Sequence, residues 1–308
     1  NLEGNICGEP YGSETASAPT ELLTYLKSAG VDLIQMANSY SVYNGLIGLN
    51  STLNNIRSAG IEPLGAYAST SDFNKTGGYT ICDVQGIKVA FVAFTKGVGG
   101  MGLPAGSENS VNLLYTDYDS NYKSVDKKGI TGILSKVASE KPDITVAMLH
   151  WGSVNSDEIS KTQTQIVDLM QKNGVDVIIG THPHLLQKIE LNEKTGKLVA
   201  YSLGDFYGDA TLGGSNYSVI LDIEITKDAD LKTTKVTNFS YIPIYTEKES
   251  ECDGFRRVVR IEPAMYAYEN NYVDKVTADS YKAMQKAMKR IVVRITGVDP
   301  DKKEEGTS

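Results

Sequence analysis

The chain has 308 residues, of which 41% are hydrophobic, and its formal net charge at pH 7 is -8. This length and composition allow a full hydrophobic core, whereas the acidic balance argues against a nucleic-acid surface, because phosphate binding needs clustered Lys and Arg. No apolar run reaches the roughly 18 residues of a membrane-spanning helix, and the cysteines Cys7, Cys82 and Cys252 form no metal-like pair at short spacing.

The first predicted elements repeat one pattern, in which a helical segment ends at a glycine and a short apolar strand follows. Gly30, Gly60 and Gly174 end the helical segments, and the strands after them are VDLIQMA, IEPLGAY and VDVIIG. We expect each glycine to adopt the left-handed conformation that ends a helix. Residues 87–95 and 143–150 are further apolar runs, typical of strands covered by helices on both faces. The alternation predicts an α/β fold.

Residues 96–111, KGVGGMGLPAGSENSV, are rich in glycine and show no helical or strand periodicity. They predict a long surface loop. Such a loop is either a simple connector or the rim of a site, and both interpretations remain open.

After Gly213 the pattern changes to that of a half-buried antiparallel strand. In SVILDIEIT, Val219, Leu221, Ile223 and Ile225 alternate with polar residues, which include Ser218, Asp222 and Glu224. The segments TKVTNFSYIPIY and FRRVVRIEP are predicted to extend this sheet.

A C-terminal helix is predicted from five residues that fall on one helical face: Tyr281, Met284, Met288, Ile291 and Ile295. Gly297 and Pro300 end it. We therefore predict one main domain over residues 1–245, a strand and helix over residues 246–298 that pack on the same domain, and a flexible tail over residues 299–308.

All three histidines of the chain follow apolar runs that are predicted strands. His150 ends ITVAMLH, and His182 and His184 lie in GTHPH, directly after VDVIIG. In an extended segment residues two apart point to the same side, so His182 and His184 are expected to present both imidazoles to one spot. His150 reaches the same edge if the two strands are neighbours. Because neutral imidazole is a common ligand of Zn, Mn and Fe, the pattern favours a metal site over three structural histidines.

Six motifs occur in a fixed order: NLEG at the start, MANSY, FVAFTKGVGG, LHWG, GVDVIIGTHPHLLQKIE and YSLGDF. Together they resemble the CapA-type capsule and poly-gamma-glutamate synthesis proteins (the PGA_cap family), within the calcineurin-like metallophosphoesterase superfamily. The resemblance covers roughly residues 1–245. It implies a calcineurin-like metallophosphoesterase fold, with a central β-sandwich flanked by helices, here with an antiparallel extension and a C-terminal helix.

The resemblance also implies a metal centre at the strand ends. His150 and His182 resemble ligands of one metal and His184 a ligand of another, Glu3 lies in the NLE motif, and Asp205 stands where the family usually has Asn. The implied cofactor is a divalent metal (Mn, Zn or Fe), as one or two ions, which would lower the pKa of a bound water and clamp a phosphate. Asp205 is alternatively a turn residue, and Glu3 a solvated one.

The chain departs from the family at several site positions. The usual Asn-Asn-His reads Asn38, Ser39, Tyr40, so that a serine replaces a ligand and a tyrosine replaces the phosphate-facing histidine. With an unperturbed pKa of about 10, a tyrosine cannot replace an imidazole that donates a proton near pH 7. We expect Asn38, Ser39, Tyr40 and Trp151 to line the pocket, and we assign no catalytic residue.

Other family residues are missing from this chain. Asn44 stands where the family has Asp, Ser153 and Val154 stand where an acidic residue often follows HWG, and the first Gly-Asp motif would precede NLEG. Two interpretations remain open. The site is complete and its first motif precedes this chain, or the site is degraded and the fold is retained.

The implied function is that of a cell-envelope protein in capsule or poly-gamma-glutamate synthesis, export or anchoring, with a partly degenerate metal site. The alternative is an active metal-dependent phosphoesterase on a phosphorylated envelope glycan or lipid. The expected partners are an anionic polymer such as poly-gamma-glutamate and a membrane-bound synthesis complex, with no nucleic acid. The expected location is extracytoplasmic, with a membrane anchor in a segment outside this chain. Because the chain is itself acidic, we expect a divalent cation to bridge the polymer carboxylates to the site.

Overall fold

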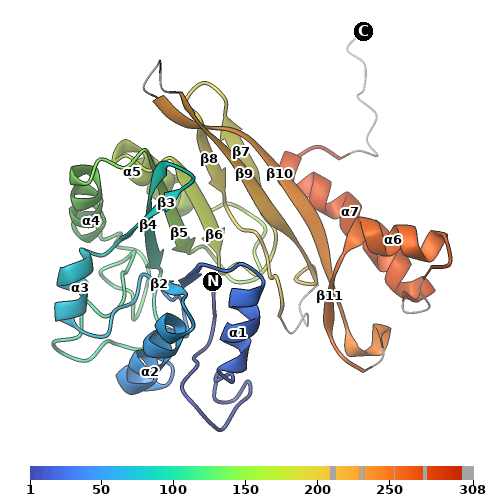
Figure 1. Ribbon diagram of the computed structural model, residues 1–308, viewed down its shortest axis with the longest axis horizontal. Coiled ribbons are helices and arrows are strands. Elements are labelled where there is room, and N and C mark those ends of the chain that lie inside the picture. Colours follow the sequence, from blue (N-terminus) through green and yellow to red (C-terminus); the bar gives the residue numbers. More distant parts are fainter. Residues whose placement is uncertain (209–212, 229, 231–232, 253, 273–275, 300–308) are drawn as a thin grey trace. The chain divides into compact units, whose positions relative to one another are not determined.

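The computed structural model describes residues 1–208, 213–228, 230, 233–252, 254–272 and 276–299 (Figure 1). The chain forms two compact units. The first unit comprises Asn1–Trp151, Lys161–Ile178 and Lys227–Thr234, and the second comprises Gly152–Ser160, Ile179–Thr226 and Lys235–Ser308. The domain bounds at residues 245 and 298 stay predictions, and the predicted tail lies outside the described residues except for Asp299.

The first unit contains most of the helix and strand alternation. Its elements are α1 (Glu21–Ser28), β1 (Leu33–Gln35), α2 (Gly45–Ser58), β2 (Glu62–Leu64), α3 (Thr70–Thr76), β3 (Thr80–Val84), β4 (Ile87–Thr95), α4 (Lys127–Ser139), β5 (Ile144–His150) and α5 (Lys161–Lys172). The strand β6 (Val177–Thr181) begins in the first unit and ends in the second.

The second unit contains most of the antiparallel structure. Its elements are β7 (Ile189–Asn192), β8 (Lys197–Ala200), most of β9 (Tyr217–Asp228) and β10 (Thr233–Glu247), the 3-10 helix η1 (Glu249–Glu251), β11 (Arg257–Arg260), α6 (Ile261–Glu269) and α7 (Ala278–Thr296). The last two residues of β9 and the first two of β10 belong to the first unit. No helix in the described ranges is long and apolar enough to cross a membrane.

The strands β4 and β5 form the centre of the first unit. β4 pairs with β3 in the antiparallel and with β5 in the parallel direction, and Thr95 lies opposite His150 in the register. Both strands are mostly buried, as the apolar runs predicted, and β1 and β2 form a separate parallel pair. The pairing thus places His150 at the carboxyl end of a buried parallel strand, where open α/β sheets hold their ligands.

The predicted helix ends are confirmed. Gly30, Gly60 and Gly174 follow α1, α2 and α5 with positive φ angles of 90°, 73° and 88°. A residue without a Cβ reaches this conformation without steric cost, so each helix stops there and the chain enters a strand. The α/β class is confirmed by this mixed sheet and its helices.

The antiparallel extension is also confirmed. β11, β10 and β9 form a three-stranded sheet in that order, and Figure 1 shows β9 and β10 as long neighbouring strands. The alternation in β9 follows the sequence, except that Ser218 is buried. The prediction that FRRVVRIEP extends the sheet was only partly right, because its last residues begin α6. Pro263 fits the first turn of a helix and lacks the N–H that a strand ladder needs.

The predicted C-terminal helix is α7. The Thr277 side chain caps it by accepting a hydrogen bond from the Ser280 N–H at 3.1 Å, and Gly297 ends it at a φ of 73°. Met284, Ile291 and Ile295 are buried as predicted. The predicted stop residue Pro300 lies outside the described residues.

Candidate functional site

The turn after β1 presents Ser39, and buried hydrogen bonds fix this turn. The Asn38 side chain is fully buried, and its Oδ1 accepts the Tyr40 N–H at 2.9 Å while its Nδ2 donates to the Leu2 carbonyl at 2.7 Å. The Asn38 N–H donates to Ser41 Oγ at 2.9 Å. Asn38 therefore acts as a positioning residue of the turn, and Ser39 remains partly exposed.

His150 is fully buried and lies against this turn. Its Nε2 is 3.0 Å from Ser39 Oγ and accepts the Ser39 backbone N–H at 3.3 Å. A backbone N–H only donates, so Nε2 is the acceptor in this contact. The Nδ1 atom lies 3.6 Å from Glu3 Oε1. The imidazole thus lies between the Ser39 turn and the Glu3 carboxylate.

Glu3 belongs to a segment that is tied to β1. The Leu2 N–H donates to the Gln35 carbonyl at 3.1 Å, and Glu3 Oε1 accepts a hydrogen bond from Asn1 Nδ2 at 2.8 Å. The Glu3 side chain is only 21% exposed. These contacts exclude a fully solvated Glu3.

The other two predicted pocket residues differ in exposure. Trp151 is fully buried directly after His150, so it packs the end of β5. Tyr40 is exposed and forms a tilted pair with Tyr43, with ring centroids 5.6 Å apart. The exposed pair gives the turn an aromatic surface beside Ser39.

The glycine-rich segment 96–111 contains no helix or strand and lies partly against the same turn. A Cβ built on Gly99 would lie 3.0 Å from the Ser39 carbonyl oxygen, and the Lys96 N–H donates to the His150 carbonyl at 2.7 Å. Burial lowers the pKa of the Lys96 ammonium group. This geometry favours the rim interpretation of the loop over that of a simple connector.

His182 and His184 lie in the second unit, in a bend after β6. Their φ angles are 95° and 61°, so the segment is not extended, and the prediction of a regular extended presentation was wrong. The two ring centroids are 6.3 Å apart and the ring planes make an angle of 49°. Non-glycine residues in such conformations cost about 1–3 kcal/mol each and persist where the surroundings impose them, which is common at functional sites. The bend therefore marks a candidate site, although its geometry is not that of a strand.

Asp205 lies beside this bend. Its Oδ1 is 2.9 Å from His184 Nδ1, and the two side chains are 21% and 28% exposed. The contact fixes the orientation of the His184 ring, as carboxylates commonly do for functional imidazoles. Phe206 and Tyr207, the next two residues, are exposed.

Each unit by itself assembles part of the implied metal ligand set. The first brings Glu3 to His150, and the second brings Asp205 to His184. Within the described ranges, no group of three or more His, Cys, Asp and Glu residues could hold a metal ion. Catalytic metal sites usually have three protein ligands, so neither pair by itself is a complete donor set for a metal ion. The metal and its ligands stay predictions.

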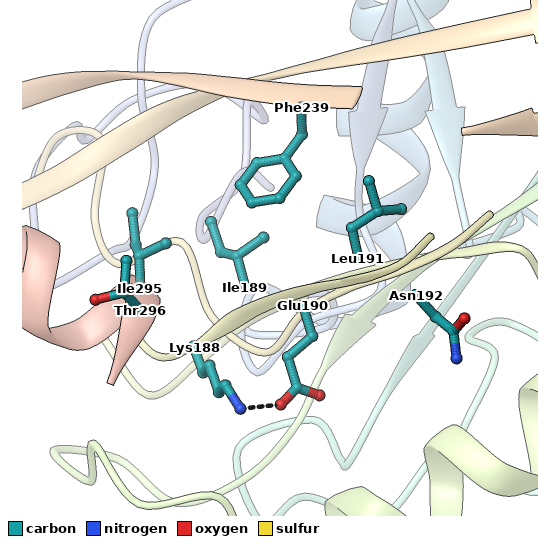
Figure 2. A pocket seen from close by; sticks show the side chains of 8 residues that line it. All are labelled: Lys188, Ile189, Glu190, Leu191, Asn192, Phe239, Ile295 and Thr296. Carbon is teal, nitrogen blue, oxygen red and sulfur yellow. Dashed lines mark ion pairs between the residues drawn. The ribbon is translucent and has the colours of Figure 1, made fainter. Parts of the chain in front are cut away.

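A separate hollow of about 500 Å³ lies in the second unit. It is lined by Lys188, Ile189, Glu190, Leu191, Asn192, Phe239, Ile295 and Thr296 (Figure 2). Figure 2 shows the ion pair between Lys188 and Glu190 at its edge. The predicted site residues are absent from this lining.

A family model described as bacterial capsule synthesis protein PGA_cap matches residues 1–210. The chain belongs to this family. Two curated relatives are each 26% identical to it: the PGA biosynthesis protein CapA of Bacillus subtilis (strain 168), which matches over 75% of this chain and 57% of that protein, and the capsule biosynthesis protein CapA of Bacillus anthracis, which matches over 63% and 44%. The PGA_cap chain thus spans about half the length of the curated relatives it matches.

Two solved structures are similar to the PGA_cap chain at a greater distance. A putative 5'-nucleotidase from Staphylococcus aureus has a TM-score of 0.49 at 13% identity, covering 87% of this chain and 44% of that chain. The calcineurin-like phosphoesterase YfkN from Bacillus subtilis has a TM-score of 0.43 at 14% identity, covering 88% and 73%. These likenesses are too distant to transfer an activity.

Proposed function

We propose that the chain acts in the synthesis, export or anchoring of an anionic capsule polymer, with poly-gamma-glutamate as the first candidate. The match of residues 1–210 to the capsule synthesis family carries this proposal, and the names of the two curated relatives support it. The proposal includes a place in the cell envelope beside a membrane-bound synthesis complex.

We propose the bend after β6 as the polymer contact. The His184 side chain is 28% exposed, whereas both ring nitrogens of His182 are buried. Imidazole N–H groups donate hydrogen bonds to carboxylates, and such charge-assisted bonds are stronger than neutral ones. The strained conformation of His182 and His184 supports a functional reason for the bend. The exposed Phe206 and Tyr207 beside Asp205 offer apolar surface to the methylene groups of a polyglutamate chain.

A bridging divalent cation would offset the repulsion between an anionic polymer and this chain, whose formal net charge is -8. The described histidines and Asp205 supply too few ligands for a metal centre of their own. Polymer carboxylates would therefore have to supply the remaining ligands, which makes cation binding and polymer binding depend on each other.

The test is the binding of fluorescently labelled poly-gamma-glutamate, measured by anisotropy with added Mn and again after chelation. We expect the double variant His182→Ala, His184→Ala to bind at least about ten-fold more weakly, because hydrogen bonds to charged groups contribute about 1.5–3 kcal/mol each. The matched control is the double variant Lys188→Ala, Glu190→Ala, which removes an exposed ion pair of the same unit without changing the net charge.

The outcomes separate the parts of the proposal. A wild-type chain that does not bind the polymer would refute the polymer role. Equal binding by wild type and the histidine variant would refute the bend as the contact, and binding that chelation leaves unchanged would refute the bridge. The metal content per chain, measured by mass spectrometry after exposure to Mn, Zn and Fe, provides a second measurement of the bridge.

A further inference from the structure

A second hollow, of about 420 Å³, lies in the first unit beside α4. One face of α4, the end of the glycine-rich segment with the residues that follow it, Phe73 of α3 and Phe94 of β4 form its walls. The strand-end histidines are not part of this lining. We propose that this α4 hollow binds a small carboxylate with an apolar body and an amide N–H, of the class of N-acylated apolar amino acids. The site is independent of the proposed polymer role.

The floor of the α4 hollow is apolar. Phe94, Val111 and Ile133 line it and are buried. The Phe73 ring packs edge-on against Tyr67, with the ring centroids 5.2 Å apart. Small-molecule sites commonly have about 300–1,000 Å³ of space, apolar walls and a few polar groups. A phenyl or branched aliphatic group therefore suits this floor.

Two glycines lie on the face of α4 that lines the hollow, and only one of them is required by its neighbours. Asp126 caps α4 by accepting the Gly129 N–H at 2.9 Å, and a Cβ on Gly129 would overlap this carboxylate. A Cβ on Gly132 would meet no heavy atom within 4 Å. Glycine is among the least favourable residues inside a helix. A glycine at position 132 that no neighbour requires supports a space kept for a ligand.

Two lysines of α4 give the hollow a positive rim. Lys136 Nζ lies over the Phe73 ring, 5.2 Å from its centroid, and Lys128 is exposed. Neither ammonium group has an ion pair with any residue that the structure describes. The two carboxylates of the lining, Glu108 and Asp126, each accept a backbone N–H at 2.9 Å. A ligand carboxylate can therefore pair with the lysines, as charge-assisted hydrogen bonds favour.

Asn112 supplies an acceptor at the hollow. Its side chain is buried, and Nδ2 donates to the Gly78 and Ala93 carbonyls at 3.1 Å and 3.0 Å. Carbonyl oxygens only accept, which fixes the amide orientation and leaves Oδ1 on the other side. No described residue donates to Oδ1, and Asn112 lines the hollow. Because buried polar atoms are normally paired, an N–H of the ligand would complete this site.

The test is the binding of N-acetyl-4-fluorophenylalanine, which combines a carboxylate, an apolar ring and an amide N–H, measured by fluorine NMR titration. We expect saturable binding to the wild-type chain with a Kd of about 1 mM or tighter. The uncharged primary amide of this compound should bind at least about five-fold more weakly, since it loses the ion pairs. The compound 3-(4-fluorophenyl)propanoate, which lacks the N–H, should also bind more weakly. No saturable binding of the first compound would overturn the proposal.

Gly132→Leu places a side chain in the hollow. It should abolish saturable binding, and the melting temperature should stay the same or rise because leucine is a strong helix former. The matched control is Ser135→Leu, at an exposed position of the same helix outside the lining, which should bind as wild type does. Wild-type affinity in Gly132→Leu would place the bound compound elsewhere and refute the hollow as its site.

The lysines have their own test, which does not depend on filling the hollow. The double variant Lys128→Gln, Lys136→Gln should bind the carboxylate about five-fold more weakly and the primary amide as wild type does. The control Lys127→Gln, Lys141→Gln removes the same charge from exposed positions outside the lining and should keep the wild-type affinity. Equal losses for the carboxylate and the amide would contradict the pairing with the lysines. Because no polymer is present, a failed polymer role would leave these results unchanged.

Discussion

His150 and the His182–His184 pair all follow apolar strands, yet the two regions differ in how the chain holds them. His150 is the last residue of β5, lies in the register opposite Thr95, and is fully buried between Ser39 and Glu3. His182 and His184 lie just past β6, in a bend with positive φ angles, where the His184 side chain is 28% exposed and the ring nitrogens of His182 are buried. A histidine inside a strand is fixed by packing, whereas a histidine past the strand end is fixed by a strained backbone. The first arrangement holds the ring in one orientation, and the second leaves part of the His184 side chain open to a ligand from outside.

The largest expected effect separates the two regions by stability. His150→Ala should lower the free energy of unfolding by about 2–4 kcal/mol, because it leaves a cavity and removes the acceptor of the Ser39 N–H. His184→Ala, at a side chain that is 28% exposed, should cost less than about 1 kcal/mol. Urea unfolding measures both. Equal costs would show that burial does not distinguish the two histidines.

The next prediction concerns the backbone. At His182, with a φ of 95°, glycine should be more stable than alanine by about 0.5–1 kcal/mol, because glycine relieves more strain than it adds in chain entropy. At His150, in a regular strand, the order should reverse by a similar amount. The four variants can be compared by their urea midpoints. The same order of glycine and alanine at both positions would contradict the distinction between packing and strain.

The smallest effect is expected at Asp205. Asp205→Asn should change the free energy of unfolding by less than about 0.5 kcal/mol, since the pair is partly exposed and the amide oxygen still accepts a hydrogen bond from His184 Nδ1. The same variant should bind poly-gamma-glutamate more tightly at low salt, because a negative charge beside the bend is gone. The gain should disappear at high salt, where exposed charges are screened. A gain that is insensitive to salt would point to a cause other than charge.

The sequence predicted the fold where local rules decide it. The glycines after α1, α2 and α5, the run that became β4 and the apolar face of α7 all follow from backbone or packing preferences of neighbouring residues. The short helix α3 and the hairpin of β7 and β8 were not predicted, because their periodic patterns are short and mixed in polarity. The strand prediction was wrong for the last residues of FRRVVRIEP, because Pro263 fits the start of a helix as well as the end of a strand.

The sequence predicted which residues belong to the candidate site, but not which of their atoms contact one another. The strand-end rule pointed to His150 and to GTHPH, and the family resemblance added Glu3 and Asp205. The serine at position 39, where the family usually has Asn, suggested only that a metal ligand is lost. A sequence motif does not show which atom the new side chain contacts. His150 contacts a backbone N–H 111 residues away in the chain, which no local pattern reveals.

The register of β4 and β5 gives His150 its position independently of its side chain. The Lys96 N–H donates to the His150 carbonyl at 2.7 Å, and the ladder pairs Phe94 with Leu149 and Thr95 with His150. Because successive side chains point to opposite faces, a slip of one residue would bring Leu149 into the same place and turn the imidazole away. The backbone pairing of β4 and β5 therefore sets the position of residue 150, whichever side chain that residue carries.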